Sequence, residues 1–354
     1  MNTFEYEEKD ITVNTACISN TPGDILYFDI ETTGLSANRS DLYLIGLGYI
    51  HKGQFYTRFL FNDDGKSEPE MLNEFAKYIS KYKYIISYNG DTFDIPYMQT
   101  KMKLFDIDCC FDNIISVDIY KTTRKYKKLF NLSSMKQIDV ENLVGFKRNI
   151  FISGVKLINT YKEYRSSGSE MLLNDLMTHN HDDVRGLISI TAFLNIPSAC
   201  TQLNISEIKV TEDSLDFICN IPSLPCRITF AAPDIRINAV GNLLNVSVPV
   251  VQKIMRFYFK DYRNYYYLPV EGMAIHKSMA EYVDSSHKER ATKDTAFTPV
   301  NDTFIPAPPF EKADLFYDGG LNGQKFIRLS KEMYENKELS TSYIQKMIKP
   351  VFAP

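Results

Sequence analysis

Two acidic residues within an apolar segment are the first sign of chemistry. Residues 25–31 read ILYFDIE and are apolar except for Asp29 and Glu31. In a strand, residues two apart point to the same face. Two carboxylates on one face repel each other and lose hydration unless a cation lies between them. Hard divalent cations prefer such oxygen ligands. The pair therefore predicts a metal site, or else an acidic strand end that caps the next turn.

A second acidic segment, SYNGDTFD at residues 87–94, follows an apolar run and precedes a helical pattern. Asn89, Gly90 and Asp91 are residue types that form turns and cap helices. Asp94 falls in the first helical turn, where the helix dipole favours an acid. The segment alone therefore fits an ordinary strand-to-helix turn as well as a functional carboxylate at Asp94.

A third segment, HNHDD at residues 179–183, lies inside a long helical pattern. His179 and Asp183 continue the apolar stripe of this helix, so we expect both to face the core. Asp182 falls on the opposite side, towards solvent. The inward pair predicts a buried His–Asp hydrogen bond, or a metal ligand with a base one turn away. The stripe consists of Leu172, Leu176, Leu187, Ile190 and Leu194.

These segments lie in an alternating order of strands and helices, which is typical of an α/β fold. Strands are expected at 25–33, 41–50, 54–61, 83–88 and 114–119, and helices at 67–81, 92–103, 132–143, 158–165 and 169–194. After a break at Pro197, short β-like runs dominate. We expect an N-terminal extension at 1–23, an α/β domain with a mixed sheet flanked by helices at 24–197, and a smaller β-rich α+β domain of unknown role at 198–354.

Composition places the chain among globular proteins. It has 354 residues, a net charge of −4, 44% hydrophobic residues and 24% charged residues, all ordinary values. No apolar run reaches the roughly 18 residues of a membrane span, and the acidic start predicts no signal peptide. The six cysteines form no CxxC pair, so we expect free thiols and a cytoplasmic location.

Basic residues gather in one segment of this acidic chain. Between Tyr120 and Arg165 there are eleven lysines and arginines against three acids. Such a segment either binds a polyanion or forms a solvated helical face. The candidate phosphate-binding residues are Lys127, Lys128, Lys147 and Arg148.

Together, Asp-x-Glu, Asn-x-x-x-Phe-Asp and His-x-x-x-Asp resemble the three exonuclease motifs of the DEDD superfamily, which has the ribonuclease-H-like fold. The resemblance covers about residues 24–195. His179 has the three-residue spacing of the Tyr-x-x-x-Asp branch, and this hybrid is similar to a bacterial branch of ribonuclease-H-like 3′–5′ exonucleases. Segments from Leu129 through Gly145-Phe-Lys-Arg and Ser153-Gly to Tyr164 also resemble that branch.

The resemblance implies two-metal hydrolysis of phosphodiester bonds. Two Mg²⁺ or Mn²⁺ ions would be held by the tetrad Asp29, Glu31, Asp94 and Asp183, with Asp29 bridging both. His179 would be the general base, unless no residue does more than orient the water. Two further assignments follow from the resemblance. The terminal nucleotide would meet Thr32, Thr33, Gly34 and Leu35, and Asn89 would position Asp94 or the substrate.

The sequence thus favours a metal-dependent 3′–5′ exonuclease acting on single-stranded nucleic acid ends. Two alternatives stay open: a nucleic-acid-binding protein of the same fold without turnover, and a ribonuclease-H-like endonuclease. No motif distinguishes DNA from RNA, because that distinction depends on contacts to the 2′-hydroxyl.

Overall fold

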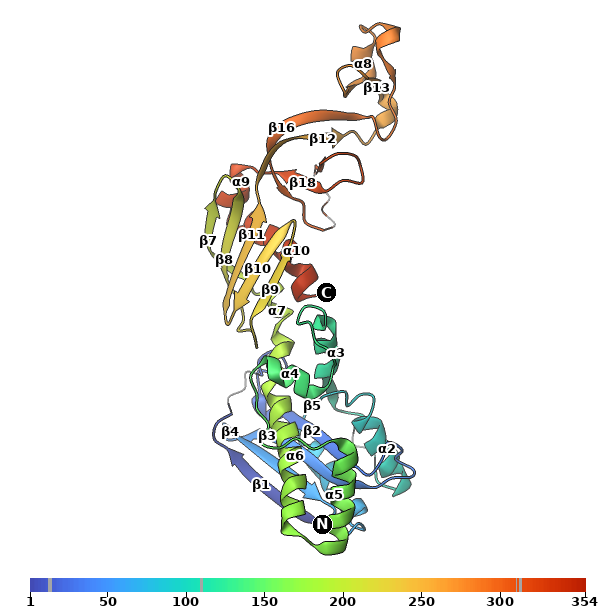
Figure 1. Ribbon diagram of the computed structural model, residues 1–354, viewed down its shortest axis with the longest axis vertical. Coiled ribbons are helices and arrows are strands. Elements are labelled where there is room, and N and C mark those ends of the chain that lie inside the picture. Colours follow the sequence, from blue (N-terminus) through green and yellow to red (C-terminus); the bar gives the residue numbers. More distant parts are fainter. Residues whose placement is uncertain (12–14, 109–110, 310, 312–313) are drawn as a thin grey trace. The chain divides into compact units, whose positions relative to one another are not determined.

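The computed structural model describes residues 1–11, 15–108, 111–309, 311 and 314–354 (Figure 1). The chain divides into two compact units. The first unit contains Met1–Ile196 and Leu224–Cys226, and the second contains Pro197–Ser223 and Arg227–Pro354. Among the described residues, no helix is long and apolar enough to cross a membrane. Cys17, Cys200, Cys219 and Cys226 are free thiols, whereas Cys109 and Cys110 lie outside the described residues.

A mixed sheet with the strand order β1-β4-β3-β2-β5-β6 forms the centre of the first unit. Strands β1 to β4 pair antiparallel, while β5 pairs parallel with both β2 and β6. The predicted alternation of strands and helices is confirmed. The strands are β1 (Asn2–Glu8), β2 (Ile25–Thr32), β3 (Leu42–His51), β4 (Gln54–Phe61), β5 (Tyr84–Ser87) and β6 (Ile115–Asp118).

Strand β1 differs from the expectation for residues 1–23. This stretch was expected to be an extension, but Asn2–Glu8 pairs with β4 along its whole length. Most of its side chains are exposed, so it lacks the apolar alternation by which a strand is found in a sequence. Its acidic residues suit an edge strand, because charge there discourages pairing with other chains.

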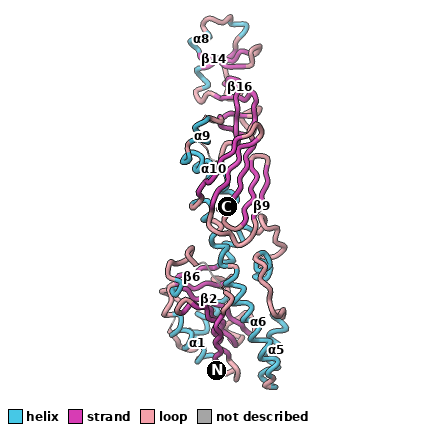
Figure 2. Tube along the Cα trace, turned by 90° about the vertical axis from the view of Figure 1, so that its left-hand side faces the viewer, coloured by secondary structure: helices cyan, strands magenta, loops and turns pink. Residues whose placement is uncertain are grey.

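Helices cover both faces of this sheet (Figure 2). On one face, α1 and α2 pack against Leu26, Phe28 and Ile30 of β2 in a single buried cluster. On the other face, α6 packs against β2 and β3, and α5 packs against α6. The helices are α1 (Glu68–Ile79), α2 (Asp94–Leu104), α3 (Ile119–Thr123), α4 (Gln137–Leu143), α5 (Gly154–Ser167) and α6 (Glu170–Ser189). Short 3₁₀ turns are η1 (Pro22–Asp24), η2 (Arg124–Tyr126) and η3 (Thr191–Asn195).

Two glycines on β3 bring α6 close to the sheet. A Cβ on Gly46 would lie 2.1 Å from Oδ1 of Asn180 and 2.8 Å from a methyl of Val184. A Cβ on Gly48 would lie 3.0 Å from the other methyl of Val184. Any larger residue at Gly46 would collide with the helix, since real Cβ atoms do not approach heavy atoms so closely. The close approach of α6 therefore depends on glycine at this position.

The second unit is rich in β structure, as expected. It contains an antiparallel sheet in the order β7-β8-β11-β10-β9, a closed barrel β12-β16-β18-β17 and a small sheet β14-β13-β15. Helix α10 packs against α7 and β7. The strands are β7 (Asn204–Val210), β8 (Ser214–Asn220), β9 (Ile228–Ala232), β10 (Ile235–Val240), β11 (Leu243–Pro249), β12 (Val251–Tyr258), β13 (Tyr265–Leu268), β14 (Met273–His276), β15 (Glu289–Arg290), β16 (Phe297–Pro306), β17 (Phe316–Tyr317) and β18 (Lys325–Arg328). The helical elements are α7 (Ser198–Thr201), η4 (Tyr262–Asn264), α8 (Lys277–Ala280), η5 (Ser285–His287), α9 (Lys331–Glu335) and α10 (Lys337–Phe352).

Candidate active site

Asp29 and Glu31 lie on the face of β2 that is turned towards α6. Their neighbours Phe28 and Ile30 point the other way, into the core beneath α1 and α2. This is the period-two alternation expected of a strand. Glu31 is 17% exposed, and its Oε2 accepts a hydrogen bond of 3.4 Å from the hydroxyl of Tyr43. The strand thus holds two partly buried carboxylates on one face.

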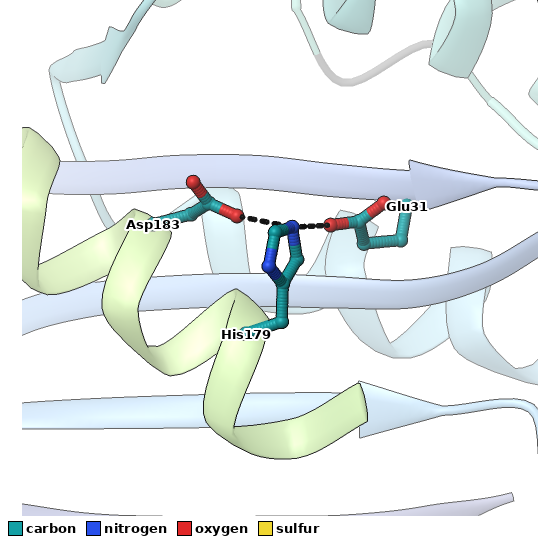
Figure 3. Close-up of side chains that lie close together, drawn as sticks. All are labelled: Glu31, His179 and Asp183. Carbon is teal, nitrogen blue, oxygen red and sulfur yellow. Dashed lines mark ion pairs between the residues drawn. The ribbon is translucent and has the colours of Figure 1, made fainter. Parts of the chain in front are cut away.

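Helix α6 brings His179 and Asp183 to the same place (Figure 3). Nε2 of His179 lies 3.1 Å from Asp183 Oδ2 and 3.5 Å from Glu31 Oε1. These three ligand atoms lie within 4.8 Å of one another. Nδ1 of His179 is buried and has no hydrogen-bond partner among the described residues. The predicted inward orientation of His179 and Asp183 is confirmed.

Asp94, the first residue of α2, contributes the fourth carboxylate. Its Oδ1 accepts a hydrogen bond of 3.3 Å from the backbone N–H of Ile30, which ties α2 to the strand between the two acids. The preceding turn is held by Asp118, whose carboxylate accepts backbone N–H groups of Asn89 and Asp91. Asp94 therefore has a fixed position beside β2.

Electrostatics show that the four carboxylates share one environment. Withdrawal from water raises the pKa of Asp29 well above its usual range, and the charges of Asp183, Asp94 and Glu31 raise it further. The pKa of Glu31 is raised in the same way. Burial, together with Asp118 and Asp183, raises the pKa of Asp94 to about 7 against two backbone hydrogen bonds that lower it. A cation placed among these groups would relieve their repulsion.

Asn180 is a site residue that the sequence reasoning missed. Its Nδ2 donates a hydrogen bond of 2.7 Å to Oδ2 of Asp29, and the residue is fully buried. It lies directly above Gly46, the cross-strand partner of Asp29. The signal was available, because position 180 continues the buried stripe between Leu176 and Val184. An asparagine at such a position requires a polar partner.

Arg148 also lies at the site, in an arrangement that its place in the basic segment did not indicate. Its Nη2 lies 2.7 Å from Asp183 Oδ1. Its Nε and Nη2 each donate a 2.7 Å hydrogen bond to Glu141, which is fully buried in α4. The guanidinium is only 10% exposed. By contrast, Lys127, Lys128 and Lys147 are exposed.

The remaining predicted contacts lie in turns around the site. Thr32 donates its hydroxyl to the carbonyl of Gly34, and the Thr33 hydroxyl accepts the N–H of Asp41. Leu35 is 87% exposed. Asn89 adopts a left-handed conformation with φ 64°, and its side-chain oxygen accepts a hydrogen bond from Thr92. These contacts account for the turns, and a role in substrate binding stays a prediction.

Two other residues of the 179–183 segment lie away from the carboxylates. His181 points towards the sheet edge and contacts Glu8 of β1 through Nε2, as expected for a residue off the metal face. Asp182 was expected to face solvent, but this was wrong: it is fully buried. Its carboxylate accepts the backbone N–H groups of Asn149 and Ile150 at 2.6 and 3.0 Å. The loop before α5 covers this face of α6.

The donor set fits hard divalent cations. Four carboxylates from three segments offer the oxygen ligands that Mg²⁺ and Mn²⁺ prefer, and the pKa values of Asp29, Glu31 and Asp94 are raised. The residues that would hold the ions are Glu31 and Asp183 beside His179, together with Asp29 and Asp94.

Comparison with known proteins agrees with this fold. Residues 26–195 match the family model described as the RNase_H superfamily. A stretch of 134 residues is 27% identical to DNA polymerase 1 of Aeropyrum pernix, covering 36% of this chain and 14% of that protein. A family B DNA polymerase from the hyperthermophilic archaeon Pyrobaculum calidifontis aligns over 86% of this chain and 40% of its own, with 13% identity and a TM-score of 0.39. The chain spans 14% and 40% of the lengths of these two polymerases. The family match over residues 26–195 confirms the expected ribonuclease-H-like domain.

Proposed function

We propose that this protein is a metal-dependent 3′–5′ exonuclease of the DEDD type, which hydrolyses phosphodiester bonds of single-stranded nucleic acid. The observation that carries the proposal is the electrostatic coupling of Asp29, Glu31, Asp94 and Asp183 on a ribonuclease-H-like sheet. Structural acids in a folded protein usually have a cationic or hydrogen-bonding partner for each charge. Here Asp29, Glu31 and Asp94 each accept a hydrogen bond and Arg148 pairs with Asp183. That guanidinium is also bound to Glu141, so it does not balance four carboxylates, and the arrangement favours cation binding.

Each residue of the site has a chemical role in this proposal. The four carboxylates would hold two Mg²⁺ or Mn²⁺ ions, which supply charge neutralisation and a more acidic water. His179 presents Nε2 on the same side as Glu31 and Asp183, where a neutral imidazole can accept a proton from the attacking water. Thr32 ends the acidic strand and Thr33, Gly34 and Leu35 follow it. We assign contact with the terminal nucleotide to the backbone of these residues and to the exposed Leu35 side chain.

Exposed lysines of the basic segment are the candidates for binding the nucleic-acid phosphates. Lys127, Lys128 and Lys147 are exposed to solvent on the segments before and after α4. Such lysines attract phosphates through counterion release, with no preference for base sequence. A ribonuclease-H-like nuclease fold and a match to part of a DNA polymerase support nucleic acid as the substrate class.

The testing experiment uses three substrates with Mg²⁺ or Mn²⁺: a 5′-labelled single strand, a 3′-labelled single strand and a closed single-stranded circle, each as DNA and as RNA. We expect a ladder that shortens by one nucleotide from the first, immediate release of labelled mononucleotide from the second and an intact circle. A cut circle would show an endonuclease. Binding of all three without any product, in a preparation whose Mn²⁺ binding is verified, would show a silent binding protein.

A further inference from the structure

The Arg148 guanidinium is fixed by Glu141, a partner that no sequence pattern indicates. Glu141 accepts from Nε and Nη2 of Arg148 in a two-pronged pair, at 2.7 Å for each bond. Such paired bonds fix the plane of a guanidinium as well as its position. Gln137 holds the carboxylate from the other side, with Nε2 donating to Glu141 Oε1 at 2.8 Å and to the Asp183 carbonyl at 2.8 Å.

Helix α6 leaves space for this carboxylate. A Cβ on Gly186 would lie 1.9 Å from Glu141 Oε1 and 3.2 Å from Gln137 Nε2. Glycine costs roughly 1 kcal/mol relative to alanine inside a helix, and here it admits a fully buried Glu141 against α6. The anchor and its cation are thus built into the packing of α4 on α6.

The pair acts on one oxygen of Asp183. Nη2 of Arg148 lies 2.7 Å from Oδ1, while Oδ2 faces Nε2 of His179 at 3.1 Å, on the side of Glu31. Glu141 and Arg148 carry opposite charges, so the pair adds little net charge to the carboxylate cluster. Its contribution is orientation: one oxygen of Asp183 is held, and the other is directed at the cluster.

We infer that Arg148, anchored by Glu141, is a positioning residue that fixes Asp183 so that Oδ2 alone is presented to a divalent metal. The inference rests on the proposed function, and it replaces substrate binding as the role of Arg148. A guanidinium with three short bonds to protein carboxylates is not available to follow a nucleic-acid backbone. Groups that orient metal ligands in this way typically contribute 10–100-fold in metal affinity or activity.

The test separates orientation from charge. Removing Arg148 alone would leave Glu141 buried and unpaired, and would make the site more negative. The double variant Arg148→Met with Glu141→Gln keeps the net charge, and apolar replacement of a buried ion pair is usually tolerated. We expect its Mn²⁺ affinity, measured by electron paramagnetic resonance on the whole chain, to fall about 10–100-fold. Its KM for a single strand should change less than about threefold at saturating Mn²⁺.

A matched control and a second variant complete the design. Arg58 bridges Glu5 and Glu74 at 3.2 Å on another part of the sheet, so Arg58→Met with Glu74→Gln should leave Mn²⁺ affinity unchanged. Arg148→Lys keeps a charge opposite Glu141 but lacks the two-pronged geometry, and should also weaken Mn²⁺ binding. Mn²⁺ affinity equal to wild type in both Arg148 variants would overturn the inference. A raised KM alone would assign Arg148 to the substrate instead.

Asp183→Asn distinguishes this failure from failure of the proposed function. If it abolishes Mn²⁺ binding while the Arg148 variants bind normally, the metal site is right and only the positioning role is wrong. If Asp183→Asn binds Mn²⁺ as wild type does, the metal site itself is wrong and the inference falls with it.

Discussion

Helix α6 carries two histidines that contact carboxylates, and their surroundings are opposite in character. His179 faces Glu31 and Asp183, with Asp29 and Asp94 nearby, so acidic charge exceeds its compensation. His181 faces Glu8, which also accepts a hydrogen bond from Thr57 and lies 3.4 Å from Nε of Arg185. We call these the crowded face and the compensated face of α6.

The pKa values reflect this difference. Burial alone would raise the pKa of Glu8, but the hydrogen bonds from His181 and Thr57 hold it below its usual range. On the crowded face, neighbouring acids add to burial and the pKa values rise. A carboxylate with a lowered pKa stabilises the fold in its ionised form. Carboxylates with raised pKa values destabilise the fold when they are ionised, unless a cation neutralises them. The crowded face is therefore the functional candidate.

The largest expected effect concerns the carboxylates themselves. Asp29→Ala or Asp183→Ala should lower kcat by about 10³-fold or more, since a catalytic metal contributes several kcal/mol and each 1.36 kcal/mol is tenfold. Thermal stabilisation by Mn²⁺ should shrink in the same variants. Glu8→Gln, on the compensated face, should keep near wild-type turnover. The assignment of the two faces would be reversed by an Asp29→Ala protein that retains most of its activity.

The two histidines give the next effect. His179→Ala should lower the rate by roughly 10²–10⁴-fold, the usual contribution of a positioned base, with little change in Mn²⁺ affinity because Asp183 remains. His179→Tyr should retain more activity than His179→Ala. His181→Ala should leave the rate nearly unchanged and cost about 1–3 kcal/mol of unfolding free energy, since it removes a partner of the buried Glu8.

Two results would contradict this ranking. Equal rate losses from His179→Ala and His181→Ala would show that the two faces do not differ in function. A large loss of Mn²⁺ affinity in His179→Ala would make His179 a metal ligand rather than a base.

The smallest effect is on stability without metal, and the two faces should give opposite pH dependence. Asp94 binds a proton more tightly in the folded protein than in the unfolded chain. Its contribution to the free energy of unfolding is therefore present below its ordinary pKa of 3.8 and is lost as the pH rises towards about 7. Glu8 binds protons less tightly when folded, so its contribution is present above 4.5 and is lost as pH falls below that value. The measurement is the free energy of unfolding in urea across this pH range, with EDTA.

Single substitutions show which residue causes each part of the pH dependence of the free energy of unfolding. Asp94→Asn should reduce the loss of stability as the pH rises and leave the loss below pH 4.5 unchanged. Glu8→Gln should reduce the loss below pH 4.5 and leave the loss at rising pH unchanged. Saturating Mg²⁺ should abolish the loss at rising pH, because a bound cation favours the ionised carboxylates. A profile that Asp94→Asn leaves unchanged would separate Asp94 from the crowded face.

Local periodicity was sufficient to predict the core of the site. Alternation in β2 placed Asp29 and Glu31 on one face, and the helical stripe placed His179 and Asp183 inward, because both patterns depend on residues close in sequence. The order of strands and helices was likewise readable from hydrophobic runs.

Contacts between distant segments account for what was missed. Asp182 is buried by backbone N–H groups about thirty residues earlier in the chain, so no helical period could show its environment. Arg148 looked like one more member of a basic segment, since its anchor Glu141 is revealed only by the packing of α4 on α6. Strand β1 was missed because an edge strand with exposed faces has no apolar alternation.

Gly46 allows the carboxylates of β2 and the carboxylate of α6 to lie close together. Asp29 and Glu31 belong to β2, and Asp183 belongs to α6. The side chains between the sheet and the helix limit how closely α6 can approach. Because Gly46 has no side chain, Asn180 lies close to the sheet and donates a hydrogen bond to Asp29. Position 46 therefore sets the distance between β3 and α6: a methyl group there would leave Asp29, Glu31 and Asp183 unchanged and still move the helix away from the sheet.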